Sequence, residues 1–494
     1  MPNPARICRF RLDKSLSRAP PTQLQLAIQA LLHEEDLAIS SLAQLPMELF
    51  PVMFEDALTQ RRTKVLKAMV PAWPFPYLPV GALLEEPDLE ILKALLDGVD
   101  VLITQGVCGS RRPKLKVLDL RKVYHSFWSK WAGSKEGESL PQVRAQKQTV
   151  ESCPGLGEKI QFKVVTNFML SEASFSEYTQ YLLQWARGRK DYICLCCREL
   201  GSHKLPIPTV IELFKTVDLD CVLDLELCLW WIDCVVYLYP YLGQMRNLHT
   251  FRLNSCRGLF SLDVSAEKEK ELTNMLLYQL SKLHSLRHLR LYGAYFLEDN
   301  LAELFRHLRN PLNSLSITYS KISQSDFNYL TLGLNVSELK HLFLSGVVLT
   351  DICPEFLGIL LERVSSILET LDLEECKMRD SHFNAMLPAL SQCFQLEKIL
   401  LEDNDISLLV LKNLLHHTGK LKKLSLEYYP APLECYEGLR ILTEKFLQFC
   451  PELLGIIWAQ REPKKIYINT KTCLTCFVSV PAKQSFSLVV LVSC

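Results

Sequence analysis

The chain has 494 residues, of which 48% are hydrophobic, and its 55 Lys and Arg residues are balanced by 55 Asp and Glu residues. A chain of this size can bury a large core, and zero net charge gives no overall attraction to nucleic acid or to an anionic membrane. Its 18 Cys residues are too few for a small disulfide scaffold, so we expect reduced thiols and a soluble protein of the cytoplasm, the nucleus or both.

The N-terminal part is expected to be helical after a short flexible start. Residues 1–21 contain Arg6, Arg9 and Arg11 without a following apolar stretch, so no secretory signal is predicted. From 22 to 110, apolar residues recur at helical spacing and favour a cap of short helices. Within this cap, the proline-rich stretch 72–79 is expected to be an extended connector packed by its aromatic residues.

The next part of the chain changes character twice. Leu115, Leu118 and Leu120 have the spacing of an inward-facing strand and predict a first repeat-like strand and helix over 111–132. Residues 133–159 then contain few apolar residues and many Gly, Ser, Glu, Lys and Gln. Such a composition predicts a mobile linker.

The same three-residue apolar cluster recurs throughout the C-terminal half, for example at Leu368, Leu371 and Leu373. Successive clusters begin at Val222, Leu248, Leu286, Leu312, Leu339, Leu368, Leu396 and Leu421. The starts are 25 to 29 residues apart, except for one longer step in which residues 267–283 are expected to form an extended helix. This period is typical of leucine-rich repeats.

A single repeat cannot bury its own leucines, so neighbouring repeats must stack. We therefore predict an α/β fold, a horseshoe-shaped solenoid with a parallel sheet on its concave face and helices on its convex face. Degenerate repeats are expected at 160–221, leucine-rich repeats at 222–450 and a tail at 451–494. Small or hydrogen-bonding residues after the strands, such as Cys256, Cys376 and Asn404, are expected where each repeat turns away from the sheet.

Alternation along each strand predicts which side chains face outward on the concave side. The predicted set is Thr250, Arg252, Asn254, His288, Arg290, Tyr292, Ser314, Ser316, Thr318, His341, Phe343, Ser345, Thr370, Asp372, Glu374, Lys398, Leu400 and Glu402. Basic and aromatic residues dominate the early strands and acidic residues the late ones. Such a gradient suits a protein substrate, and we predict that it binds Arg252, His288, Arg290, Tyr292, His341, Phe343, Asp372, Glu374, Leu400 and Glu402.

No pattern indicates catalysis, a cofactor or a metal site. The sequence has no Gly-x-Ser-x-Gly, no His-Glu-x-x-His and no complete phosphate-binding Gly-rich loop. Cys473 and Cys476 supply only two of the four ligands that structural zinc needs, and buried or surface thiols are the simpler interpretation. We predict that the chain is not an enzyme.

Two apolar features have a structural and a functional interpretation. The run at 223–242 contains Asp224, Glu226, Asp233 and Pro240, so it is expected to be buried core and not a membrane span. Leu-x-x-Leu-Leu occurs at 92–96, 357–361 and 411–415. On an exposed helix this motif suits a nuclear-receptor groove, but packing inside a repeat buries the same leucines.

Several blocks in one order resemble the PRAME family (preferentially expressed antigen in melanoma and its paralogues). They lie at 45–51, 66–75, 118–122, 240–245, 310–318 and 344–351. The resemblance implies a leucine-rich horseshoe that serves as a substrate receptor of a cullin-RING ubiquitin ligase, joined to the cullin through elongin C and elongin B. It also implies negative regulation of transcription, including retinoic-acid signalling, and of differentiation and apoptosis.

On this resemblance, the elongin C-binding segment would include Leu42, Leu45, Pro46, Leu49 and Phe50. The segment has Pro46 where the elongin C-binding pattern has Cys, and Phe50 where the pattern has an aliphatic residue. Docking of an apolar helix into a groove would provide the mechanism. A structural cap on the first repeat fits the same residues. The alternative function is a transcriptional corepressor or scaffold that acts without ubiquitination.

Overall fold

The computed structural model describes residues 23–84, 86–108, 113–123, 126–129, 161–229, 232–255, 265–308, 310–438, 440–462, 464–469 and 487–491. The expected linker at 133–159, Cys256, the Cys473 and Cys476 pair and about half of the tail lie outside these ranges. The chain divides into two compact units. The first contains Met1–Val165 and Ser176–Cys194, and the second contains Thr166–Phe175 and Leu195–Cys494.

The first unit is mainly helical over the expected range. Its helices are α1 (Gln23–His33), α2 (Glu35–Ser41), α3 (Leu49–Thr59), α4 (Thr63–Ala72), α5 (Leu89–Cys108), α6 (Ser126–Ser129) and α7 (Glu177–Arg187). Helices α4 and α5 pack closely at Gly98, where a Cβ atom would lie 2.6 Å from the Lys67 carbonyl oxygen. This close approach explains a glycine inside a helix, where it ordinarily costs stability.

The proline-rich connector is extended, as predicted, and it also supplies the first strand. β1 (Tyr77–Pro79) pairs in parallel with β2 (Val117–Asp119), and β2 pairs in parallel with β3 (Phe162–Ser171). Its aromatic residues pack around Trp73, which is 1% exposed and lies 5.8 Å from Phe75 between ring centres. Pairing with β2 fixes the connector against the repeat strand predicted at Leu115 to Leu120.

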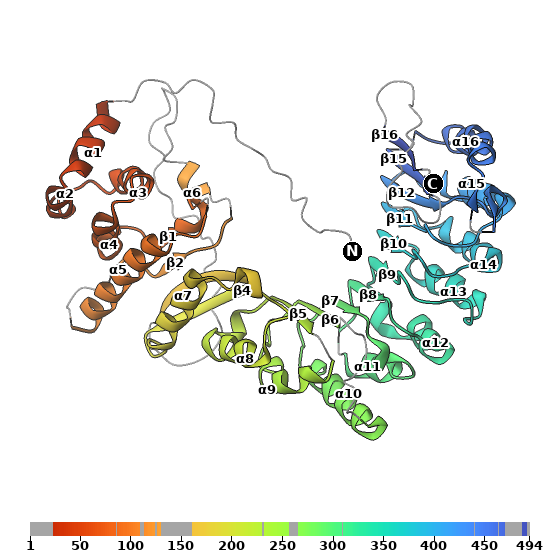
Figure 1. Cartoon of the computed structure of the whole chain (residues 1–494), viewed down its shortest axis with the longest axis horizontal. Helices are drawn as coiled ribbons and strands as arrows, with labels where there is room; N and C mark the ends of the chain where they lie inside the picture. The colour runs from red at the N-terminus through yellow and green to blue at the C-terminus, as the bar shows by residue number, and fades with distance from the viewer. Residues whose placement is uncertain are drawn as a thin grey trace. The chain divides into compact units, whose positions relative to one another are not determined.

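The second unit is built on a parallel sheet whose strands follow chain order (Figure 1). Its strands are β4 (Ile193–His203), β5 (Asp224–Leu229), β6 (Thr250–Ser255), β7 (His288–Tyr292), β8 (Ser314–Thr318), β9 (His341–Phe343), β10 (Thr370–Asp372), β11 (Lys398–Leu400), β12 (Leu426–Pro430), β15 (Lys465–Asn469) and β16 (Ser487–Leu491). A short antiparallel pair, β13 (Tyr436–Glu437) and β14 (Arg440–Ile441), lies outside this sheet. The predicted leucine-rich repeat solenoid with a parallel sheet is confirmed.

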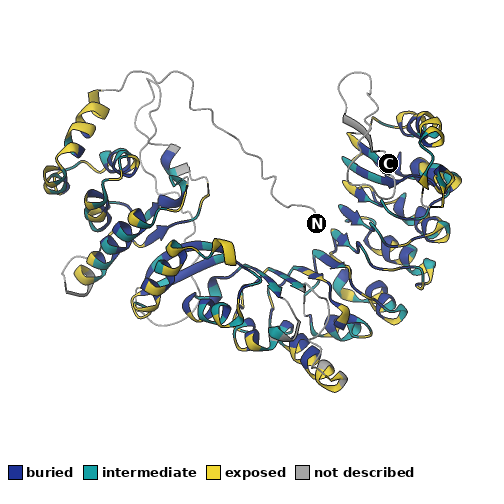
Figure 2. Cartoon of the chain, viewed as in Figure 1, coloured by how far each residue is buried: buried dark blue, intermediate teal, exposed yellow. Residues whose placement is uncertain are grey.

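Helices connect successive strands and lie on the other side of this sheet from the concave face (Figure 1). They are α8 (Ile207–Thr216), α9 (Tyr239–Leu242), α10 (Ala266–Leu280), α11 (Leu301–His307), α12 (Gln324–Leu332), α13 (Pro354–Val364), α14 (Asp380–Leu390), α15 (Leu408–Thr418) and α16 (Thr443–Trp458). The extended helix expected at 267–283 is α10. Buried residues lie between strands and helices, and exposed ones cover the outer helix faces (Figure 2).

Six repeats leave their strands through a residue with left-handed backbone. Equivalent positions with positive φ are Lys204, Gly293, Tyr319, Gly346, Glu375 and Asp403. In the late repeats the next residue is Cys376 or Asn404, which lie where the chain turns away from the sheet, as predicted, and both are buried. The Asn404 side chain donates to the carbonyl oxygens of Leu373 and Leu401, each at 2.8 Å, and accepts from the Met378 amide. These bonds replace ladder hydrogen bonds that end with the strand.

The predicted register is correct up to β11 and wrong at β12. Ile399 is aligned with Glu427, and Lys398 with Leu426, so the last step is 28 residues and not 25. Glu427 therefore occupies an inward position and is fully buried, whereas Leu426 is not an inward residue. The sheet also continues through β15 and β16, beyond residue 450 where the predicted repeats end.

The described residues include no helix that is both long and apolar enough to cross a membrane. The run at 223–242 forms β5, a 3-10 helix (Ile232–Leu238) and α9. The inward-facing residues of β5 are Leu225, Leu227 and Leu229, and they are buried, as predicted for a core segment.

Candidate recognition surfaces

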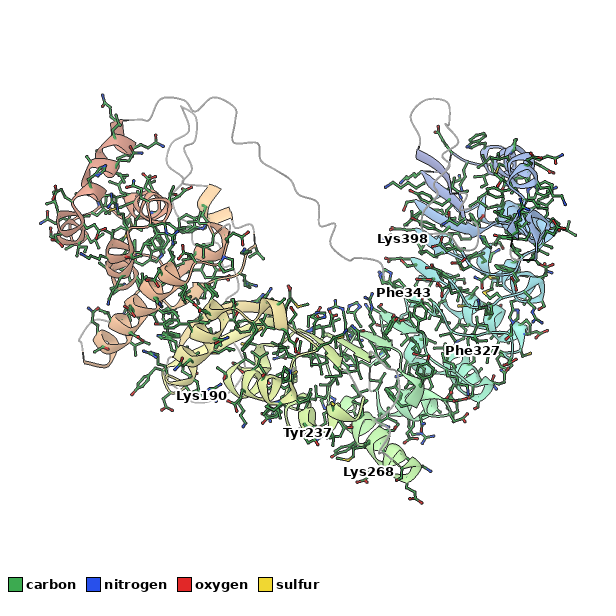
Figure 3. The ribbon with its side chains drawn as sticks, viewed as in Figure 1. Lys190, Tyr237, Lys268, Phe327, Phe343 and Lys398 are labelled. Atoms are coloured by element: carbon green, nitrogen blue, oxygen red, sulfur yellow. The ribbon has the colours of Figure 1, made fainter. Side chains whose placement is uncertain are left out.

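Parallel pairing arranges the concave-face side chains in rows that cross the strands. One row contains Thr250, His288, Ser314, His341, Thr370 and Lys398. The next row contains Arg252, Arg290, Ser316, Phe343, Asp372 and Leu400. Neighbours in a row are about 4.8 Å apart along the sheet, so residues far apart in sequence form one surface. Phe343 and Lys398 lie on this side, and Tyr237 and Lys268 on the helical side (Figure 3).

A hollow of about 290 Å³ opens on the concave face and is named here the basic hollow. It is lined by Thr250, Arg252, His288, Leu289, Arg290 and Ser314. Arg252 pairs with Asp224 of β5. Arg290 is exposed and has no carboxylate partner among the described residues. Burial lowers the pKa of His288, and the positive charges of His341, His249 and Arg252 lower it further.

Aromatic side chains border the basic hollow. The Arg290 guanidinium carbon lies 5.9 Å from the Phe343 ring centre, although strand β8 runs between their strands. This contact is possible because the intervening residue of the row is the small Ser316. Tyr292 and Tyr319 are both exposed, and their ring centres are 5.3 Å apart. Exposed aromatic residues beside a cation are typical anchors for a protein partner.

Acidic residues gather on β10 and after β11. Burial raises the pKa of Glu374 to about 8, with further increases from the charges of Glu402 and Asp372. Burial also raises the pKa of Glu402 and of Asp372. Glu402 accepts a hydrogen bond from the Asn469 side chain. Glu374 and Glu402 therefore favour a state in which they share a proton.

The charge distribution differs from the predicted gradient. Asp224 and Glu226 on β5 precede the basic residues and contact Arg252 and Asn254 respectively. Acidic side chains therefore lie on both sides of the basic hollow. The predicted set of outward residues begins at Thr250 on β6, so it does not include the acidic residues of β5.

Three residues predicted to be outward and exposed are buried. Ser316 is 3%, Thr370 6% and Ser345 9% exposed. Longer side chains in the same rows cover them. His341 Nδ1 lies 3.1 Å from the Thr370 hydroxyl oxygen, for example. The side chains do point to the concave side, but short residues between long ones lose contact with solvent.

Sequence reasoning missed an aromatic pair at the C-terminal end of the face. The rings of Tyr428 on β12 and Tyr467 on β15 stack with centres 4.5 Å apart and planes 11° apart. Both residues continue the row that contains Leu400. The error in the β12 register hid this pair, because it placed Leu426 inward.

The predicted adaptor-binding residues do not share one exposed face. Leu42 and Phe50 are buried, at 7% and 4% exposed, while Leu45 and Leu49 are half-buried and Pro46 is exposed. Phe50 packs against Trp73, with ring centres 6.1 Å apart. Leu42 and Phe50 are therefore core residues, and only the other three can contact a partner directly.

Other apolar residues of the same helices are exposed. Leu37 on α2 is 57% exposed, Met47 in the turn before α3 is 40% exposed, and Leu24 and Leu26 on α1 are 45% and 51% exposed. Helices α1 and α2 contact each other, and exposed large apolar side chains on neighbouring helices are typical of an interaction site. Their exposure could not be read from apolar spacing alone.

Comparison with known proteins identifies the family to which the chain belongs. Residues 20–128 match the model of the PRAME N-terminal domain, and residues 162–485 match the model of the PRAME C-terminal domain. The chain belongs to the PRAME family. It is 45% identical to Oogenesin-3 of Mus musculus over 475 residues, covering 95% of this chain and 94% of that protein. It is 41% identical to PRAME family member 8 of Homo sapiens over 461 residues, covering 93% of this chain and 96% of that protein.

Among solved structures, an internalin from Listeria monocytogenes is similar with a TM-score of 0.33 and 14% sequence identity. The similarity covers 62% of this chain and 80% of the internalin chain.

Three of the PRAME-like blocks contribute to the hydrophobic and ionic core of the first unit. Phe50 from the block at 45–51 contacts Trp73 from the block at 66–75. In the block at 118–122, Asp119 is 1% exposed and accepts hydrogen bonds from the Arg121 guanidinium, one of them at 2.7 Å, and from the Tyr77 hydroxyl. Part of the family signature is therefore explained by packing alone.

The three Leu-x-x-Leu-Leu motifs of this PRAME family chain are core segments. Leu92, Leu95 and Leu96 are at most 1% exposed. The corresponding leucines of 357–361 and 411–415 are equally buried, and they are Leu357, Leu360, Leu361, Leu411, Leu414 and Leu415. The structural interpretation is confirmed, and these leucines are not available to a nuclear-receptor groove.

Among the described residues, one cluster of three carboxylates on the concave face could hold a cation. Glu374, Glu375 and Asp403 place ligand oxygens within 4.8 Å of one another. Surface carboxylates often gather in this way without an ion, and no further feature points to one. The expectations of no metal, no cofactor and no enzymatic activity stay predictions.

Proposed function

We propose that this PRAME family protein is a substrate-recognition subunit of a cullin-RING ubiquitin ligase. Its N-terminal helices bind elongin C, which with elongin B links it to the cullin scaffold, and its concave face binds the protein to be ubiquitinated. The observation that carries the proposal is an exposed apolar surface on the first unit, separate in sequence from the polar and aromatic concave face of the second. Family membership supports it.

The elongin C contact is assigned to the exposed apolar residues of α2 and the following turn. Leu37, Leu45, Pro46, Met47 and Leu49 are at least partly exposed and carry no charge. Apolar side chains presented from a helix and an adjacent turn suit docking into a hydrophobic groove of a partner. Leu42 and Phe50 would act indirectly, by fixing α2 and α3 in place.

The substrate contact is assigned to the concave face. Arg252, Arg290, Tyr292 and Phe343 combine charge with aromatic anchors, and Glu374 and Glu402 provide the opposite charge farther along the sheet. Complementary charges of this kind set specificity and association rate more than affinity. Ubiquitin transfer itself would be carried out by the partner complex.

The adaptor contact is tested by capture of purified elongin C with elongin B. Leu37→Asp and Met47→Asp, combined, should reduce capture at least about tenfold, because each places a charge in an apolar contact. The matched control is Leu409→Asp on α15, since Leu409 is 68% exposed and lies in the second unit. Equal capture by the wild type and the N-terminal variant would show that the docking site is wrong.

A corepressor function without ubiquitination is the alternative. It predicts repression in a retinoic-acid-responsive reporter that persists under proteasome inhibition and in the Leu37→Asp, Met47→Asp variant. The ligase proposal predicts that both treatments relieve repression. The roles in differentiation and apoptosis that the family resemblance implies would follow from either route, so they do not separate the two.

A further inference from the structure

The basic hollow contains more hydrogen-bond donors than its own residues use. Guanidinium groups of Arg252 and Arg290 and the hydroxyls of Thr250 and Ser314 come from three adjacent strands and line one hollow of about 290 Å³. Guanidinium groups present planar sets of N–H donors that match the oxygens of carboxylate and phosphate groups. The lining therefore suits an anion.

The charge of the hollow also favours an anion. Asp224 neutralises Arg252, but Arg290 lies against the Phe343 ring and has no carboxylate partner among the described residues. His288 lines the hollow, where burial lowers its pKa and the positive charges of His341, His249 and Arg252 lower it further, so positive charges repel one another at this site. A bound anion would relieve this repulsion.

A phosphate group fits the donor set better than a carboxylate does. A phosphorylated side chain carries a charge of about −1.5 to −2 at neutral pH and has three acceptor oxygens. A carboxylate has one charge and two oxygens in one plane. Donors that approach from β6, β7 and β8 surround the hollow, so a tetrahedral group can accept from several of them at once.

The surroundings favour a protein segment over a nucleic acid. Asp224 and Glu226 lie on one side of the hollow, and Asp372, Glu374 and Glu402 lie on the other. A nucleic-acid backbone, with a charge at every nucleotide, would meet these carboxylates on either side. A peptide with one phosphate would not, and Tyr292, Tyr319 and Phe343 offer contacts for its neighbouring side chains.

We propose that the basic hollow binds the phosphorylated serine or threonine of a protein segment that crosses strands β6 to β9. This inference deepens the substrate-recognition part of the proposed function and rests on it only in identifying the segment as part of a substrate. Arg290 is the central contact. Arg252, Thr250 and Ser314 complete the donor set.

The test uses the full chain and a degenerate library of short peptides with phosphoserine fixed at the centre. Matching libraries carry serine or glutamate at that position, and a single-stranded RNA of mixed sequence is the fourth probe. Binding of the phosphoserine library should exceed that of the serine and glutamate libraries at least about tenfold, because both lack the doubly charged group. Binding of RNA should be weak and independent of Arg290.

Arg290→Ala should weaken binding of the phosphoserine library about tenfold or more, without loss of thermal stability, because Arg290 is exposed. The matched control is Arg306→Ala on the convex helix α11, which should bind as the wild type does. Equal binding of the serine or glutamate library, unchanged binding by the Arg290 variant, or Arg290-dependent binding of RNA would overturn the proposal. Capture of elongin C by Arg290→Ala should be normal, so failure here is distinguishable from failure of the adaptor contact.

Discussion

Glu374 and Glu402 are two carboxyl groups that face each other on a partly buried surface. Because the pKa of Glu374 is raised from 4.5 to about 8, the folded chain binds more protons than the unfolded chain between these values. The contribution of Glu374 to the free energy of unfolding then falls as the pH rises through this window, and this contribution is fully present only below the unfolded pKa. Burial of charge at neutral pH is the physical cause.

Glu374→Gln should remove this pH dependence. At pH 8 the variant should be more stable than the wild type by about 1–2 kcal/mol, which is less than the full pKa shift implies because the pair is partly solvated. Urea unfolding midpoints of the two chains between about pH 5 and pH 8 provide the measurement. Glu362→Gln, on the exposed face of α13, is the control and should follow the wild type. Parallel curves for wild type and Glu374→Gln would contradict the assignment.

Alternation along a strand predicted the direction of each side chain better than it predicted the solvent exposure of that side chain. Arg290, Tyr292 and Lys398 are exposed on the concave face as predicted. Ser316 and Thr370 point to the same side but are buried, because neighbours on the adjoining strands cover them. Exposure depends on the lengths of side chains across a row, and this information is absent from any single strand.

The last repeats show how one charged residue changes the interpretation of an element. Glu427 fills the inward position that Ile399 fills in the preceding repeat, and its carboxylate contacts Arg461 at 2.5 Å. The Tyr429 hydroxyl lies 2.9 Å from both Glu427 and Thr418. Since apolar spacing cannot recognise an inward glutamate, it selected Leu424 for this position, three residues earlier. Only the partner, 34 positions farther along, reveals why a glutamate is tolerated.

Arg461→Met should leave the Glu427 charge buried without its partner and reduce the free energy of unfolding by about 3–5 kcal/mol. Adding Glu427→Leu should restore most of this loss, because leucine is the usual residue at an inward position and Tyr429 keeps its contact with Thr418. Chemical unfolding of the two variants and the wild type checks both statements. A double variant as unstable as Arg461→Met would mean that Glu427 is not the cause.

For the whole molecule, the period of the leucine clusters predicted most of the architecture. It correctly predicted a parallel sheet, helices on its other side and the long α10, because each follows from local spacing and the need to stack repeats. It did not predict the hollow or the pairing of Arg290 with Phe343, since both depend on residues from different strands. Identifying surfaces therefore required three-dimensional structure, although their strands could be named from sequence.

The same limit applies to the first unit. Spacing predicted its helices, and the family blocks predicted where an adaptor would bind. Burial then separated Leu42 and Phe50, which hold the helices together, from Leu37 and Met47, which are exposed. One sequence block can contain both core residues and residues that contact a partner, and the sequence alone does not show which are which.

Under the proposed function, one protein uses two separate surfaces, one for an adaptor and one for a substrate. Affinity capture followed by quantitative mass spectrometry tests it most directly, with the wild type, Leu37→Asp combined with Met47→Asp, and Arg290→Ala combined with Phe343→Ala. The first variant should lose elongin C and cullin but keep other proteins, and the second should keep elongin C but lose a defined subset of the others. Loss of the same proteins from both variants, or of none from either, would contradict the proposal.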